Sequence, residues 1–169
     1  MKNVIGIARI VFGSIFLWAF FDKLFGLGYA TCRDSKTMEV MVGCEKAWIS
    51  GGSPTEGFLK FGTHGPFATF YQSLSGNILV DLLFMGGLLF IGTALVLGIG
   101  MKIATYGGVL LMLLVWSSLL PPENNLIIDE HIMYAFLFLI LNYTNAGDIL
   151  GFGKYWKKKG LGKKHSAFI

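Results

Sequence analysis

Charged side chains inside long apolar segments are the first residues of this chain that could do chemistry, because an ionisable group in hydrocarbon is costly and usually functional. Five of them are expected at a similar depth, near one end of the segments: Asp22, Lys23, Asp81, Glu130 and His131. Carboxylates beside a histidine can carry protons, and a lysine among them can bind an anion. Each residue singly also suits a helix end, where acids favour the N-terminus and lysine reaches water. Together they favour a site.

Three aromatic residues are expected at the same depth: Trp18, Trp116 and Tyr134. Trp18 precedes Asp22 by four residues and Tyr134 follows Glu130 by four, so each ring shares a helix face with an acid. We expect these rings to line the site. The candidate catalytic residues, which would handle protons there, are Asp22, Asp81, Glu130 and His131.

The apolar segments that must position these residues are long enough to cross a membrane. Hydrophobic residues make up 54% of the 169-residue chain and charged residues 14%, against roughly 25% charged in a soluble domain. A crossing helix needs roughly 20 apolar residues, and four windows meet or approach that length: residues 4–25, 78–99, 103–120 and 130–146. We predict an all-α integral membrane protein, a single domain over residues 1–157 built as a four-transmembrane-helix bundle.

Lysine placement predicts how the bundle is oriented, because lysine and arginine prefer cytoplasmic loops. The final stretch, "GFGKYWKKKGLGKKHSAFI", holds six lysines and no acid, whereas the link "PPENNLIIDE" holds three acids and no base. We predict a multi-pass protein of the plasma membrane with both termini cytoplasmic, a long outer loop at residues 26–77, and a basic cytoplasmic tail at residues 158–169. The net charge of +4 reflects this tail. Its partners are then the lipid bilayer and anionic lipids rather than nucleic acid.

The outer loop contains the only two cysteines, Cys32 and Cys44. An oxidising exterior makes a disulfide the default expectation. A redox or sulfur-carrying thiol and an unpaired cysteine are the alternatives, although the spacing is not the C-x-x-C of redox motifs. The following stretch, "GGSPTEGFLKFGTHGP", is rich in turns and aromatic residues. We favour an aromatic belt at the membrane interface, with a lid over a pocket as the alternative.

Arg9 is a separate case, because it lies about two turns inside the first window, towards the opposite end of the segments from the five charged residues named above. It could reach back to the membrane surface. We favour a structural ion pair with Asp148, at the end of the last window. The small-residue pairs Ala94–Gly98 and Ala104–Gly108 suit close helix packing and carry no chemistry.

Three stretches together resemble the DoxX-like superfamily: "RIVFGSIFLWAFFDKLFGLG", "MGGLLFIGTALVLGIGMK" and "DEHIMYAFLFLILNYTNAGDILGFGKYW". The loop "WISGGSPTEGFLKFGTHGPF" resembles the DoxD branch, the small membrane subunit of thiosulfate:quinone oxidoreductase. The resemblance covers about residues 5–157. Positions matching the superfamily's patterns are Arg9, Lys23, Glu130, Gly147 and Asp148. It implies oxidation of thiosulfate to tetrathionate at the outer face, electron transfer to quinone, and a second, DoxA-like subunit.

On this resemblance, Lys23 or Arg33 would attract thiosulfate, and quinone would lie against Trp18, Trp116 and Tyr134. No nucleotide-binding, haem-attachment or C-x-x-C motif is present in the sequence, and we predict neither a bound prosthetic group nor a metal. The alternatives are a non-catalytic membrane partner of a redox enzyme and, less favoured, a small-solute carrier. The carrier is weaker because no inverted repeat is apparent.

Overall fold

The computed structural model describes residues 2–34, 37–123 and 125–158, and within these ranges the regular elements are helical, with no strand. The four long helices are α1 (Lys2–Phe25), α3 (Ile78–Leu97), α4 (Met101–Ser118) and α5 (Glu130–Tyr143). The short ones are η1 (Trp48–Ser50), η2 (Phe58–Gly62), α2 (Ala68–Ser73), η3 (Ala146–Asp148) and α6 (Gly153–Lys158). The predicted all-helical class is confirmed. The predicted tail at 158–169 lies, apart from Lys158, outside the described residues.

Three helices, α1, α3 and α4, are long and apolar enough to cross a membrane. Their bounds agree with the predicted windows to within two residues. The helix α5 differs, because it ends at Tyr143 after 14 residues and gives way to a turn and to η3. At 1.5 Å per residue it covers about 21 Å, less than the roughly 30 Å of hydrocarbon. The structure therefore supports a membrane protein with three spanning-length helices and a shorter fourth one.

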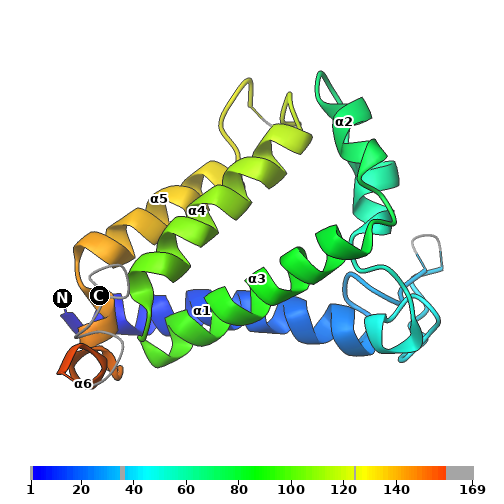
Figure 1. The fold of residues 1–169 in the computed structure, drawn as a ribbon. Helices are drawn as coiled ribbons and strands as arrows, with labels where there is room; N and C mark the ends of the chain where they lie inside the picture. Colours follow the sequence, from blue (N-terminus) through cyan, green and yellow to red (C-terminus); the bar gives the residue numbers. More distant parts are fainter. Residues whose placement is uncertain (1, 35–36, 124, 159–169) are drawn as a thin grey trace.

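The long helices form two antiparallel pairs, α1 with α3 and α4 with α5. Figure 1 shows that the pairs meet near the N-terminus and α6 and diverge towards α2. Where they meet, the ring of Phe138 on α5 lies 4.7 Å from that of Phe12 and 5.4 Å from that of Phe16. Gly108 on α4 leaves room for Phe138, since a Cβ there would overlap the ring. We call the end where the pairs meet the joint end and the opposite one the loop end.

The joint end is built around Arg9, which is fully buried. Its Nη1 donates to the carbonyls of Leu95 and Val96, and its Nη2 donates to those of Ile149 (3.1 Å) and Leu150 (3.0 Å). The last carbonyls of a helix have no partner within it, and a cation at that end is favoured by the helix dipole. Arg9 therefore joins α1 to the end of α3 and to the segment that follows η3.

The predicted pair between Arg9 and Asp148 is not formed. Asp148 accepts instead from the Nζ of Lys157 at 2.9 Å, while the two terminal nitrogens of Arg9 are taken by carbonyls. A guanidinium fork can satisfy several carbonyls at once, and at this joint the carbonyls of α3 are nearer than the carboxylate. The backbones also approach closely here, because a Cβ on Gly98 would lie 2.6 Å from the carbonyl oxygen of Gly147.

Replacing Arg9 should destabilise the whole fold. In Arg9→Met four carbonyls lose their donor and a buried site loses its cation. We expect the free energy of unfolding to fall by about 3 kcal/mol or more, seen as a lower Tm in detergent. Arg9→Lys should also lower Tm, because one ammonium cannot serve both sets of carbonyls. The matched control is Arg33→Met, at an exposed arginine of the outer loop. Equal Tm values for Arg9→Met and Arg33→Met would contradict this role.

Candidate functional site

Asp22, a predicted catalytic candidate, holds the beginning of the outer loop. Its buried carboxylate accepts from the backbone N–H groups of Tyr29 (3.0 Å), Ala30 (2.9 Å) and Thr31 (3.1 Å). Backbone groups that leave a helix near lipid need partners, because an unpaired amide is costly there. The geometry gives Asp22 a structural task, since both its oxygens are engaged by the loop.

Asp81 holds the second half of the same loop. Its Oδ1 accepts from the hydroxyl of Ser53 at 2.9 Å, and from the hydroxyl and N–H of Thr55 at 2.5 and 3.3 Å. The carboxylate is buried at the beginning of α3. The turn-rich stretch at residues 51–55 is therefore attached to the helix bundle through one acid. Like Asp22, Asp81 is committed to the loop.

The remaining loop candidates are spread apart. Cys32 and Cys44 form a disulfide, so neither offers a free thiol in this structure. Arg33 is exposed within the ring that this disulfide closes. The Nζ of Lys23 lies 5.9 Å from the ring centroid of Phe84, on the neighbouring helix α3. The two predicted anion ligands thus lie in different surroundings, one partly buried and one exposed.

The three predicted quinone-binding rings have three different sets of partners. Trp18 packs against Tyr29, with 5.1 Å between ring centroids. Tyr134 packs against Phe12 at 5.3 Å, inside the bundle. Trp116 donates its indole N–H to the carbonyl of Ile127 at 2.7 Å. These contacts do not bring the three rings into one binding site.

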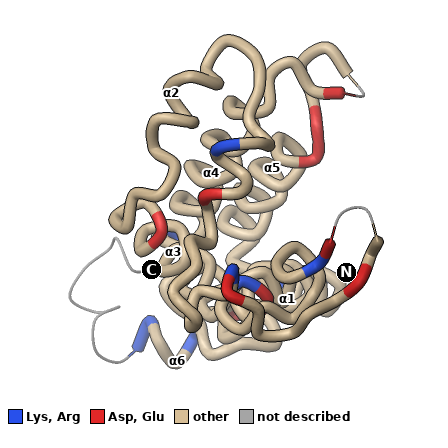
Figure 2. The backbone as a smooth tube through the Cα atoms, turned by 90° about the vertical axis from the view of Figure 1, so that its right-hand side faces the viewer, with Lys and Arg blue, Asp and Glu red and all other residues tan. Residues whose placement is uncertain are grey.

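A pocket of about 170 Å³ lies at the loop end, between the outer loop and the link that joins α4 to α5 (residues 119–129, the α4–α5 link). We call it the loop-end pocket; its lining residues are His64, Leu119, Pro122, Glu123, Ile128, Asp129 and Glu130. Three of these side chains are acidic and three are apolar. Figure 2, viewed from the loop end, shows acidic residues on the link and at the beginning of α5. Of the predicted site residues, the pocket includes only Glu130, with His131 next to it in sequence.

His131 is paired with Asp129 beside this pocket. Asp129 caps α5, its Oδ1 accepting from the N–H groups of His131 (3.0 Å) and Ile132 (3.2 Å). Its Oδ2 lies 2.8 Å from His131 Nδ1. A carboxylate at Nδ1 favours the imidazole tautomer with its proton there, which leaves Nε2 to accept or release a proton. The pair has the geometry of an oriented acid–base group.

Within the described part of the chain, His64 is the one lining residue of the loop-end pocket that belongs to the outer loop. Its backbone N–H donates to the carbonyl of Ser118 (3.2 Å), and its ring Nε2 lies 3.2 Å from the carbonyl oxygen of Pro121. Gly65 permits this approach, because a Cβ at that position would overlap the carbonyl of Leu120. The Tyr71 hydroxyl adds a bond to the Ser117 hydroxyl at 2.6 Å.

The sequence did not reveal that Asp129 partners His131, although the D-x-H spacing at a helix N-terminus is a signal that could have done so. For His64 there was no signal, because its position depends on the path of the whole loop. The ligand atoms of Asp129, Glu130 and His131 lie within 4.8 Å of one another, close enough to share an ion. Both oxygens of Asp129 already accept hydrogen bonds, however, and we assign no metal.

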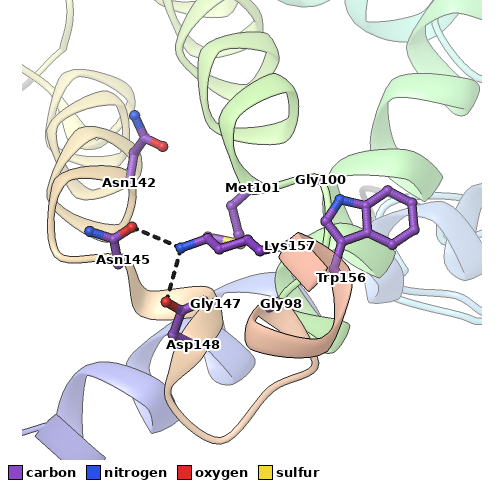
Figure 3. Close-up of a pocket in the computed structure, with 10 residues that line it drawn as sticks. Gly98, Gly100, Met101, Asn142, Asn145, Gly147, Asp148, Trp156 and Lys157 are labelled. Carbon is purple, nitrogen blue, oxygen red and sulfur yellow. Dashed lines mark hydrogen bonds and ion pairs between the residues drawn. The ribbon is translucent and has the colours of Figure 1, made fainter. Parts of the chain in front are cut away.

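A smaller pocket of about 40 Å³ lies at the joint end (Figure 3). Lys157 points into it and donates to the side chains of Asn145 (3.1 Å) and Asp148 (2.9 Å). This volume admits about one or two water molecules and no organic substrate. The joint-end pocket is therefore part of the attachment of α6 to the bundle.

Comparisons of this chain with family models, with curated proteins and with solved structures find no match. The resemblance to the DoxX-like superfamily therefore rests on the sequence motifs alone.

Replacing Asp22 or Asp81 by asparagine should loosen the outer loop. The amide keeps one acceptor oxygen and substitutes a donor for the other, so Asp22→Asn turns an NH₂ group towards backbone N–H groups. We expect each change to cost about 1–3 kcal/mol of loop stability and to raise the rate of tryptic cleavage within residues 26–77 by about five-fold or more. Glu45→Gln, at an exposed loop acid, is the matched control. Cleavage at the control rate would show that the carboxylates do not hold the loop.

Proposed function

We propose that this chain is the membrane subunit of a quinone-linked sulfur-compound oxidoreductase that oxidises thiosulfate to tetrathionate. The sequence resemblance suggests the reaction. The observation that carries it furthest is the His131–Asp129 pair, with 2.8 Å between Nδ1 and Oδ2, beside a half-apolar pocket at the loop end. On this proposal α5 is the fourth crossing, both termini are cytoplasmic, and the loop end faces outwards in the plasma membrane.

The proposed reaction needs a supply of protons, and the His131–Asp129 pair would provide it. Two thiosulfate ions each lose one electron and join through a sulfur–sulfur bond, and no proton is released. Quinone takes up the two electrons and two protons as it becomes quinol. Both protons must therefore come from elsewhere, through a group that exchanges protons with water. His131 is suited to this, because Asp129 holds its ring through Nδ1, so that a proton can be exchanged at Nε2.

The loop-end pocket suits the quinone side of the reaction better than the sulfur side. Leu119, Pro122 and Ile128 provide apolar walls, and about 170 Å³ admits a small ring but is below the roughly 300–1,000 Å³ of ordinary ligand pockets. Only a head group would fit, with the tail in lipid. The acids Glu123 and Glu130 would repel a doubly charged thiosulfate ion. Thiosulfate would instead be attracted by Lys23 or Arg33, together with a DoxA-like subunit.

The second candidate function, a non-catalytic membrane partner of a redox enzyme, is favoured by a different observation. Asp22 and Asp81 hold the outer loop. The ring closed by the disulfide exposes four apolar side chains: Met38, Val40, Met41 and Val42. An exposed apolar patch on a firmly attached loop is typical of a protein interaction site.

The test is thiosulfate-dependent reduction of a short-chain quinone by the purified protein, alone and with membrane extract. His131→Gln should lower turnover about 100-fold, the usual scale of acid–base catalysis. Asp129→Asn should also lower it while leaving Tm nearly unchanged, because asparagine caps a helix about as well as aspartate. The control is Glu45→Gln, at an exposed loop acid outside residues 37–42.

Full turnover in both His131→Gln and Asp129→Asn would show that the His131–Asp129 pair takes no part in the reaction. Turnover only with extract would assign the sulfur step to a partner. Absence of turnover in both preparations would favour the non-catalytic function, which trimming of residues 37–42 would then test through loss of a co-purifying redox subunit.

A further inference from the structure

The short helix α6 runs across the direction of the long helices. In Figure 1, α1 and α3 lie along the plane of the picture, whereas α6 is seen nearly end-on beside the N-terminus. Since α1, α3 and α4 have the length and composition of membrane spans, a helix that crosses them at the joint end lies along the membrane surface.

Several contacts fix α6 in this orientation. The Nζ of Lys157 donates to Asn145 and Asp148, at the two ends of η3 (Figure 3), and the N–H of Phe152 donates to the carbonyl of Leu97 at 2.8 Å. Gly153 allows the helix to begin against the bundle, because a Cβ there would lie 2.6 Å from the Oδ1 of Asp148. The segment is therefore attached at its beginning and its end.

The side of this segment that faces away from the bundle is both apolar and basic. Leu150, Phe152 and Tyr155 are 56%, 62% and 61% exposed. Lys154 and Lys158 are exposed as well, and their four-residue spacing places them on the same face of α6. From residue 149 to the last residue the sequence contains no acid. We call these five residues the α6 surface.

This combination fits a lipid head-group layer. Aromatic and leucine side chains next to lysines are typical of helices that lie in the membrane interface, where rings enter the head-group region and lysines meet phosphate. The negative charge of such a layer attracts nearby lysines. A membrane surface also adjoins the α6 surface directly, because the spanning helices end there.

We propose that the α6 surface binds the head groups of anionic phospholipids. Lys154 and Lys158 contact the lipid phosphates, and Phe152 and Tyr155 enter the interface. Lys157 does not contact lipid; it is the positioning residue, because its ion pair with Asp148 holds the helix against the bundle. The inference is independent of the redox proposal, since it depends only on the joint end being at a membrane surface.

The experiment measures lipid binding to the full-length protein in a neutral detergent, by native mass spectrometry. Phosphatidylglycerol and phosphatidylcholine are titrated separately. Wild-type protein should bind phosphatidylglycerol at least ten-fold more tightly than phosphatidylcholine. Each lysine contributes about a five-fold factor, so Lys154→Gln/Lys158→Gln should lose most of this preference without a change in Tm in lipid-free detergent.

Two further variants make the result specific. Lys46→Gln/Lys60→Gln removes two exposed lysines of the outer loop and should keep the preference, which excludes an effect of net charge. A variant with the tail lysines 159, 163 and 164 changed to glutamine should keep a preference of at least five-fold. Equal binding of the two lipids by wild type, equal loss in the outer-loop variant, or loss only in the tail variant would overturn the proposal.

Discussion

Burying the guanidinium of Arg9 obliges three segments to meet at the joint end, because a buried cation is costly unless acceptors surround it. The last carbonyls of α3 and those of Ile149 and Leu150 are the partners. They need donors as much as the cation needs acceptors, since a helix end leaves its carbonyls unpaired. One side chain thus sets where α1 crosses α3 and where the chain turns after α5. The α4–α5 pair diverges from the other pair only beyond this point.

At the loop end the backbone groups that need partners are N–H groups, and carboxylates take the place that a cation has at the joint end. Irregular backbone beside lipid needs acceptors for its N–H groups, and the carboxylates of Asp22 and Asp81 provide them. Because these acids hold both halves of the outer loop, the loop can extend across the bundle and place His64 against the α4–α5 link. The position of the loop-end pocket therefore depends on structural charges elsewhere in the chain.

The structural use of these charged side chains explains which features could be predicted from sequence. Apolar length predicted α1, α3 and α4, and the oxidising exterior predicted the pairing of Cys32 and Cys44. Local pattern does not reveal whether a carboxylate near a helix end faces a ligand or its own loop, so Asp22 and Asp81 received catalytic roles that the geometry does not support. Arg9 was paired with an acid because opposite charges attract, whereas carbonyls at a helix end compete equally well for a guanidinium.

The acidity of the loop-end pocket constrains any redox function. A pocket lined by Glu123, Asp129 and Glu130 attracts protons and repels anions, so it cannot serve both proton uptake and the binding of thiosulfate. Arg33 is an exposed cation in the ring closed by the disulfide, and its backbone bridge to Val40 places it beside the apolar patch of that ring. A partner seated there would bring its own anion-binding groups beside Arg33. The catalytic and the partner interpretations then converge: proton exchange would belong to this chain, and the sulfur chemistry to the interface that its outer loop forms.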